Sequence, residues 1–264
     1  MNKVVLISGA SSGIGFTTAK YLAEKNYIVI GLSRSYPKIK YNFDYYLCDI
    51  TDESAIIKTV NAIEEKYGKI NYLINSAGVG ISGAIENTPL NDVKTIYNVN
   101  VYGQFLLTKI CLRLLRKSQN AKIINISSIA SEIALPFQSF YSMTKSSIDA
   151  FTKALRIEVK PFNIQVMALL PGDIKTDFTK NRKKPFEDKK DLYKDRVDKS
   201  IKKMEQDETK GMNPLVIAKA INKLLKRKKL PITKTVGFSY KMIRFLNRIL
   251  PEKLVSYFVV KLYG

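Results

Sequence analysis

Apolar and polar residues follow two periods along the chain, and segments of the two kinds alternate. Short apolar runs rich in β-branched residues occupy residues 4–7, 27–32, 70–74, 123–126 and 165–169. Such runs are typical of strands buried on both faces of a parallel sheet, and a further strand is expected at 44–48. Apolar residues at helical spacing lie between them, at 16–25, 52–67, 90–117 and 141–160. The alternation predicts an α/β fold: one domain over residues 1–264 with a doubly wound parallel sheet and helices on both faces.

The last third of the chain has a different character. Residues 180–212 form a highly charged insert, expected to be helical and to lie on the substrate side. An amphipathic helix at 214–225 and a short strand at 232–236 follow. Residues 238–264 repeat apolar residues at helical spacing among lysines and arginines, with a break at Pro251. These C-terminal helices either cover the substrate cleft or a dimer partner, or lie on an anionic bilayer with the apolar face down.

Composition narrows the chemistry. The 264 residues include no histidine, which excludes Ser-His-Asp and Cys-His catalysis and removes the commonest zinc ligand. We therefore expect no metal site. Cys48 and Cys111 lie in apolar contexts and are interpreted as structural thiols of a reducing cytoplasm. The first apolar run is too short for a signal peptide, and no apolar run approaches the roughly 18 residues of a membrane span. A cytoplasmic protein, with peripheral membrane contact as an alternative, is expected.

The net charge of +21 is uneven, and about two-thirds of the excess follows residue 180. Solvated surfaces explain such charge, as does attraction to anionic lipid or an anionic substrate. Nucleic acid is not an expected partner, because no nucleic-acid-binding motif accompanies the charge.

A glycine-rich turn follows the first predicted strand and opens a helix. Gly9 permits a tight turn, Gly13 lets the backbone approach a pyrophosphate, and Gly15 allows the helix to pack closely on the strand. The helix N-terminus then offers amide donors and a positive dipole end to the phosphates. A plain tight turn is the alternative, but the flanking strand and helix favour a dinucleotide site.

The ends of the next strands bear on which dinucleotide binds. Ser33 leaves uncharged the place where an acidic residue would bind ribose hydroxyls, and Arg34 can pair with a 2′-phosphate. These residues favour NADP(H) over NAD(H), with an exposed loop arginine as the alternative. Asp49 is placed either to meet the adenine amino group or to cap the next helix, whose N-cap is expected near Thr51. Asn75 is expected to brace the sheet, with room for a ribose beside it.

The segment from 123 to 153 holds the candidate chemistry. Ser128 follows a buried strand, at the edge where open α/β sheets bind ligands. Tyr141 and Lys145 are four residues apart, which stacks them on one helix face. A nearby ammonium is expected to lower the pKa of the phenol toward general acid–base work. Asn100 lies inside an apolar helix, where its amide either serves the site or bridges to backbone.

Together these segments closely resemble the short-chain dehydrogenase/reductase family. The resemblance runs from residue 4 to about 179 and rests on six motifs: SGASSGIG at 8–15, NSAG at 75–78, Asn100, Ser128, YSMTK at 141–145 and PGDIKT at 171–176. It implies a Rossmann-type domain whose own glycine spacing is G-x-x-x-G-x-G. Two departures are Ser8 for the usual threonine and Ser76 for the second asparagine of NNAG, and altered affinity is expected from them.

The resemblance also implies roles for the tetrad Asn100, Ser128, Tyr141 and Lys145. Tyr141 donates the proton, Ser128 orients the carbonyl, Lys145 binds the nicotinamide ribose, and Asn100 holds a relay water. Ile174 and Thr176 contact the nicotinamide carboxamide. The full set of expected cofactor contacts is Gly9, Ser11, Ser12, Gly13, Ile14, Gly15, Ser33, Arg34, Asp49, Ile50, Asn75, Ala77, Gly78, Tyr141, Lys145, Pro171, Gly172, Ile174 and Thr176.

The predicted function is NADPH-dependent reduction of a carbonyl, reversible as alcohol oxidation, on an apolar or lipid-like substrate. The C-terminal end resembles family members that act on hydroxysteroids, retinoids or acyl-dihydroxyacetone phosphate. By the same resemblance the protein is expected to be a homo-oligomer. A non-catalytic nucleotide-sensing or scaffold protein with this fold is the alternative.

Overall fold

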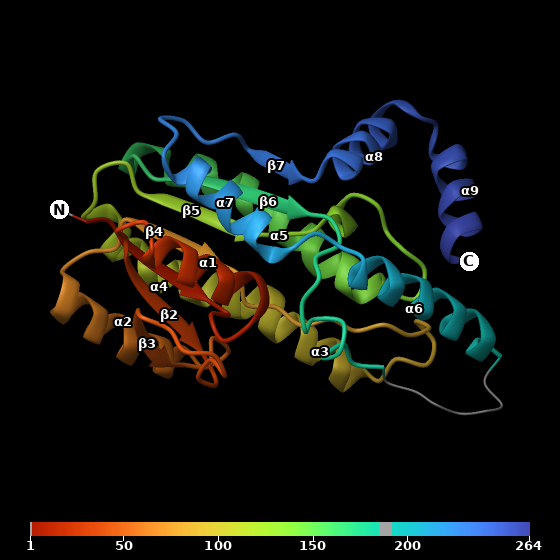
Figure 1. Ribbon diagram of the computed structural model, residues 1–264, viewed down its shortest axis with the longest axis horizontal. Helices are drawn as coiled ribbons and strands as arrows, with labels where there is room; N and C mark the ends of the chain where they lie inside the picture. The colour runs from red at the N-terminus through yellow and green to blue at the C-terminus, as the bar shows by residue number, and fades with distance from the viewer. Residues whose placement is uncertain (1, 185–191) are drawn as a thin grey trace.

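One parallel sheet organises the computed structural model, which describes residues 2–184 and 192–264 (Figure 1). Within these residues the strands are β1 Val4–Ser8, β2 Ile28–Ser33, β3 Asp44–Leu47, β4 Tyr72–Asn75, β5 Lys122–Ile126, β6 Gln165–Pro171 and β7 Thr233–Val236. Their order is β3-β2-β1-β4-β5-β6-β7, and every pair is parallel. The order reverses between β1 and β4, the place where doubly wound sheets bind ligands. The predicted fold is confirmed, and β7 extends the sheet by one strand on β6.

Helices cover both faces of the sheet because successive strand residues point to opposite sides. The described helices are α1 Gly13–Ala23, α2 Glu53–Tyr67, α3 Leu90–Tyr97, α4 Gln104–Arg116, α5 Ser139–Glu158, α6 Lys194–Thr209, α7 Pro214–Leu225, α8 Phe238–Ile249 and α9 Glu252–Tyr263. Leu6 faces a core formed with α2, α4 and α5, whereas Val5 and Ile7 face a core formed with α1 and α7. Filling both faces leaves the strand ends as the place for a site.

The helix predicted over 90–117 is divided by a π-helical turn, Asn98–Gly103, between α3 and α4. Two contacts accompany the turn. The Asn100 side chain bonds the backbone of Val79, and a Cβ on Gly103 would collide with Ile50. A π turn inside an α-helix is frequent at functional sites. Here it brings Asn100 to the end of β4.

Most predicted boundaries are shifted by a few residues, and the start of α2 is one of them. The N-cap of α2 is Asp52 and not Thr51, because the Asp52 carboxylate accepts the amide of Ala55 at 3.1 Å. Thr51 instead donates through its amide and its hydroxyl to Asp49. Of the charged insert over 180–212, residues 185–191 lie outside the described residues, and α6 forms most of the remainder.

A buried polar ladder joins the ends of the two central strands. The Asn75 amide nitrogen donates to Asn125 Oδ1 and to Thr108 Oγ1, both at 2.9 Å, and Asn125 Nδ2 donates to Thr152 Oγ1 at 2.8 Å. The predicted bracing role of Asn75 is confirmed. Because α4 and α5 supply the threonines, the ladder ties both helices to the ends of β4 and β5.

Replacing Asn125 with alanine is expected to lower the free energy of unfolding by about 2–4 kcal/mol, because buried partners on two elements lose their hydrogen bonds. Urea denaturation followed by circular dichroism measures the change. The control is Asn91→Ala, an exposed asparagine on α3, which should stay within about 0.5 kcal/mol of wild type. A loss below about 1 kcal/mol in Asn125→Ala would contradict a stabilising ladder.

Candidate active site

The glycine turn after β1 has the conformation that its sequence predicts. Gly9 and Gly13 have φ values of 68° and 55°, in the region that favours glycine, and a Cβ on Gly15 would collide with the Gly9 carbonyl. The Ser12 side chain makes no capping bond to α1, and no acidic residue lies in its first turn. The α1 N-terminus therefore fits an anion, as a dinucleotide pyrophosphate requires.

The adenosine end of the expected cofactor site lies at the ends of β2 and β3. The Ser33 hydroxyl donates to the Ser35 carbonyl at 2.7 Å and bonds the hydroxyl of Tyr45. Arg34 is exposed, and its guanidinium pairs with no carboxylate among residues 2–184 and 192–264. The 35–43 crossover contains no helix, as its length predicts, and Tyr41 and Phe43 pack there with ring centroids 4.9 Å apart. Arg34 is thus left available to an anion.

Asp49 and Ile50 both lie beyond β3, where the sequence places the adenine. Asp49 Oδ1 accepts the amide and the hydroxyl of Thr51 at 2.9 and 2.8 Å. Asp49 therefore does not cap α2, and contact with an adenine stays a prediction. Ile50 packs against Gly103 of the π turn.

The loop after β4 is tied to the end of β1. The Ser8 hydroxyl accepts the amides of Ser76 and Ala77 at 3.1 and 3.3 Å. The serine that replaces the family's usual threonine thus keeps a hydroxyl at the switch point. A Cβ on Gly9 would collide with the Ala77 backbone, so the two loops can approach only because residue 9 is glycine.

Ser128, Tyr141 and Lys145 are brought together, as predicted. The Lys145 ammonium donates to the Ile126 carbonyl at 2.9 Å and lies 5.6 Å from the centre of the Tyr141 ring. The Ser128 hydroxyl lies near enough to the Tyr141 phenol to lower its pKa, and Ser128 Oγ also accepts the Ala130 amide at 3.1 Å. The end of β5 and one face of α5 therefore bring the hydroxyls of Ser128 and Tyr141 to the same place.

The pKa of the Tyr141 phenol is raised, whereas the sequence predicts that it is lowered. Burial raises the pKa of Tyr141 to about 12, and it outweighs the lowering effects of the Ser128 hydrogen bond and the Arg182 guanidinium. Burial also lowers the pKa of Lys145 to about 8, against the opposing charge of Asp149. The predicted lowering of the tyrosine pKa is wrong for this state of the chain, because loss of water exceeds the effect of nearby charge.

Asn100 reaches the same place through the π turn. Its Oδ1 accepts the Val79 amide at 2.8 Å, and its Nδ2 donates to the Val79 carbonyl and to Thr144 Oγ1 at 3.0 and 3.1 Å. A Cβ on Gly78 would contact both Asn100 Oδ1 and Lys145 Nζ. Of the two roles considered for this asparagine, the structure shows the bridge to backbone, and the relay water stays a prediction.

The loop after β6 faces the glycine turn. Thr176 lies against Gly13, and Ile174 bridges to Met212 at the start of the segment before α7. Gly172 is covered by the ring of Tyr240. Pro171 is the last residue of β6. The loop expected to contact the nicotinamide therefore lies beside the turn expected to contact the pyrophosphate.

Three residues near the tyrosine were not anticipated. The Phe178 ring lies 5.5 Å from the Tyr141 ring, and the guanidinium of Arg182 lies over Phe178. Arg182 is buried and pairs with Glu208 of α6. No local pattern reveals this pair, because its members are 26 residues apart. An aromatic residue two positions after the PGDIKT motif is the signal that could have pointed to Phe178.

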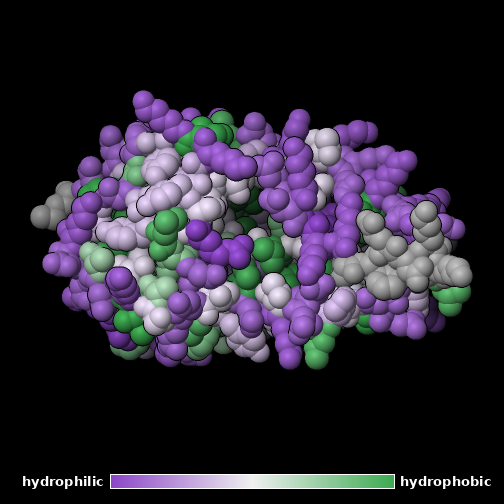
Figure 2. Space-filling view, turned by 90° about the horizontal axis from the view of Figure 1, so that it is seen from below, coloured by the Kyte–Doolittle hydropathy of each residue, from purple (hydrophilic) through white to green (hydrophobic). Residues whose placement is uncertain are grey.

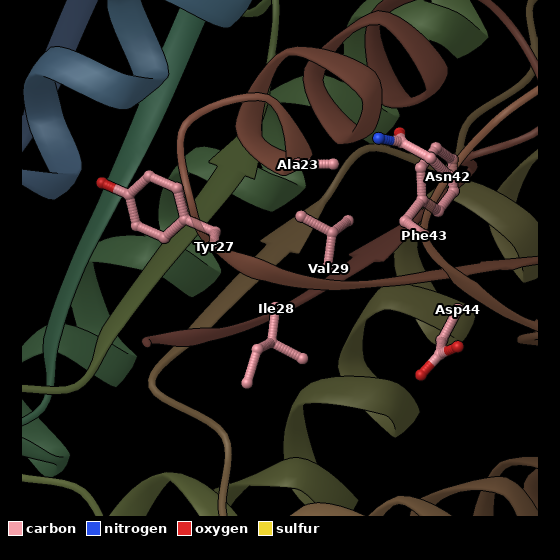
Figure 3. A pocket seen from close by; sticks show the side chains of 7 residues that line it. All are labelled: Ala23, Tyr27, Ile28, Val29, Asn42, Phe43 and Asp44. Carbon is pink, nitrogen blue, oxygen red and sulfur yellow. The ribbon is translucent and has the colours of Figure 1, made fainter. Parts of the chain in front are cut away.

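The surface of the molecule is hollowed in more than one place. Seen from below, the molecule is hollowed near its middle, and hydrophobic residues show among hydrophilic ones there (Figure 2). A separate pocket of about 200 Å³ lies at the starts of β2 and β3, lined by Ala23, Tyr27, Ile28, Val29, Asn42, Phe43 and Asp44 (Figure 3). It opens at the opposite end of these strands from Ser33 and is no part of the catalytic edge.

Comparison with known proteins decides the family. The family model described as short chain dehydrogenase matches residues 3–186. A 3-ketodihydrosphingosine reductase of Bacteroides thetaiotaomicron is 35% identical over 257 residues, covering 97% of this chain and 96% of that protein. The chain belongs to the short-chain dehydrogenase family.

Solved structures agree with this assignment. A short-chain dehydrogenase from Streptomyces avermitilis has a TM-score of 0.82 at 26% identity and covers 99% of this chain and 97% of its own. ElxO with NADP bound has a TM-score of 0.75 at 26% identity and covers 92% of this chain and 100% of its own. A 3-ketoacyl-(acyl-carrier-protein) reductase from Brucella melitensis, complexed with NADH, has a TM-score of 0.74 at 26% identity and covers 89% of this chain and 96% of its own.

As a short-chain dehydrogenase, the protein is an oxidoreductase of a family that uses NAD(P)(H). Among residues 2–184 and 192–264, no helix is long and apolar enough to cross a membrane. The same residues contain no cluster of cysteine and carboxylate side chains suited to hold a metal ion.

Lys145 generates a prediction about stability and pH. Its pKa is about 8 in the folded chain and 10.5 ordinarily, so between these values the unfolded chain binds more protons and stability rises with pH. Relative to Lys145→Met, wild type should gain about 3 kcal/mol between pH 8 and pH 10.5, at about 1.4 kcal/mol per pKa unit. Urea denaturation across this range measures the difference.

The matched control is Lys153→Met, an exposed lysine on α5. Because Lys153 is exposed, its replacement should change the free energy of unfolding by no more than about 0.5 kcal/mol. A difference between Lys145→Met and wild type that stays flat over this pH range would show that the Lys145 ammonium is not desolvated.

Proposed function

We propose that the protein is an NADPH-dependent carbonyl reductase, reversible as an alcohol dehydrogenase, that acts on an apolar or lipid-like ketone. The observation that carries the proposal is the convergence of Ser128, Tyr141 and Lys145 at the end of β5. A hydroxyl donor beside a half-buried phenol, with an ammonium behind the ring, suits proton transfer to a carbonyl oxygen.

In the proposed reaction the bound nicotinamide cofactor supplies the hydride that the carbonyl carbon accepts. The Ser128 hydroxyl donates a hydrogen bond to the carbonyl oxygen and holds it near Tyr141. The O–H bond of Tyr141 breaks, and its proton passes to that oxygen, so that C=O becomes CH–OH. Lys145 stabilises the phenolate that remains, and a proton from solvent then restores the phenol.

The raised pKa of Tyr141 keeps the phenol in the protonated form that reduction of a carbonyl requires. With a pKa of about 12, the phenol carries its proton at neutral pH, which is the form that a general acid requires. Oxidation of an alcohol needs the phenolate and is therefore expected to become faster as pH rises.

The substrate proposal draws on the surroundings of the tyrosine and on one relative. The Phe178 ring and Gly80 beneath it form an apolar wall beside Tyr141. The 3-ketodihydrosphingosine reductase matches over nearly the whole length of both chains, including the variable last third. A long-chain ketone fits both observations better than a small polar one.

Replacing Tyr141 with phenylalanine is expected to lower turnover of long-chain ketones by at least about a hundredfold, because the proton donor is lost. NADPH oxidation at 340 nm measures turnover, and isothermal titration should show NADPH binding nearly unchanged. The control is Tyr102→Phe, an exposed tyrosine. Wild type that binds nucleotide but turns over no ketone would favour the scaffold alternative.

The choice of cofactor is tested at Arg34. A charge-assisted bond to the 2′-phosphate contributes about 1.5–3 kcal/mol, so Arg34→Ala should weaken NADPH binding about tenfold to a hundredfold. NADH affinity should barely change. Lys38→Ala, an exposed cation of the same crossover, is the control for general charge. Equal losses in the two variants, or wild-type preference for NADH, would overturn the assignment of Arg34.

A further inference from the structure

The two C-terminal helices stand outside the core. No residue of α8 or α9 is buried. Figure 1 shows both helices, in dark blue, beyond the edge at which β6 and β7 end. In most amphipathic helices of globular proteins the apolar side faces the core. α8 is oriented differently.

Polar side chains attach α8 to the rest of the molecule. The Tyr240 hydroxyl donates to Asp173 Oδ2 at 2.6 Å, and Arg244 donates to both carboxylate oxygens of Glu132. Asn247 donates to the Glu132 carbonyl at 3.4 Å. Because Tyr240, Arg244 and Asn247 recur at helical spacing, they define one side of α8 and fix which side faces inward.

The opposite side of α8 is apolar and exposed. Phe238 is 81% exposed, Phe245 56% and Ile249 58%, and Met242 and Leu246 lie between them. α9 is attached through Tyr263, whose hydroxyl donates to Asp207 of α6 at 3.0 Å. We call a subset of the exposed apolar residues of both helices the tail surface: Phe238, Met242, Phe245, Leu246, Ile249, Leu254, Tyr257 and Phe258.

The charges around the tail surface indicate what kind of partner binds it. Exposed cations accompany it on both helices, namely Lys241, Arg248, Lys253 and Lys261, whereas Glu252 is the one acidic residue in 238–264. A second copy of the chain would bring the same cations and a further net charge of +21. An anionic bilayer offers apolar depth and negative charge together.

We propose that the tail surface docks on an anionic lipid bilayer, with α8 and α9 lying in the interface and not crossing it. This inference goes beyond the proposed reaction and does not depend on it. The ring of Tyr240 covers Gly172 in the loop that leads to Thr176. Docking would therefore hold the catalytic edge of the sheet near the lipid.

The test is flotation of the full chain with vesicles of phosphatidylcholine alone or with about a third phosphatidylserine, at about 0.15 M salt. Wild type should float with the anionic vesicles and much less with the neutral ones. The double variant Phe245→Ser and Phe258→Ser should partition at least about tenfold more weakly, because two aromatic rings no longer leave water. Lys241→Glu with Arg248→Glu should weaken anionic binding by a similar factor.

Matched controls distinguish binding through the tail surface from non-specific hydrophobic and electrostatic binding elsewhere on the molecule. Ile85→Ser with Ile157→Ser removes two exposed apolar side chains elsewhere, and Lys226→Glu with Lys228→Glu reverses two exposed cations elsewhere. Both should float like wild type. Light scattering follows the oligomeric state, and circular dichroism verifies folding.

Two outcomes would overturn the proposal. Equal loss of flotation in the Lys226 and Lys228 control would mean that overall charge, and not the tail surface, attracts the vesicles. Absence of flotation, with dimers that Phe245→Ser and Phe258→Ser dissociate, would mean that the tail surface meets a second copy. Neither outcome bears on ketone reduction, which is assayed separately.

Discussion

The bond from the Lys145 ammonium to the Ile126 carbonyl is the contact on which the arrangement of the site depends. It joins α5 to the end of β5 inside a region from which water is excluded. Because Tyr141 lies on the same face of α5, fixing one side chain also places the other. Ser128 follows β5 by two residues, so the same strand end places the hydroxyl opposite the phenol. Fixing the ammonium in this position removes it from water, and this desolvation lowers the pKa of Lys145.

Buried amide side chains fix the end of the neighbouring strand, β4, in the same way, through directional hydrogen bonds. Asn75 and Asn125 link the ends of β4 and β5, and Asn100 holds the backbone at Val79 from the far side of a π turn. An apolar core can fix the spacing of a sheet and its helices but is poorly suited to orienting loops, because hydrophobic contacts lack direction. Directional bonds at the strand ends supply that orientation.

Local signals explain how much could be predicted. The strands, the glycine turn and the Tyr141–Lys145 pair depend on residues within a few positions of each other, and all were located to within a few residues. The π turn depends on Val79, which is distant in sequence from Asn100, and so its helix was expected to be continuous. The pKa of Tyr141 was misjudged for a related reason. Its nearest charge is visible in the sequence, whereas its enclosure depends on how distant segments fold around it.

The C-terminal helices show a different limit of sequence periodicity. Apolar spacing over 238–264 reveals that the helices have an apolar side, but it does not state which side faces the protein. The structure answers this for α8 through Tyr240 and Arg244, whose partners Asp173 and Glu132 lie on the body of the molecule. Once polar bonds hold the inner side, the apolar side must face outward. A contiguous exposed apolar surface of this kind is rare on a monomer in water and marks a place where something else binds. The surrounding cations narrow that partner to one of negative charge.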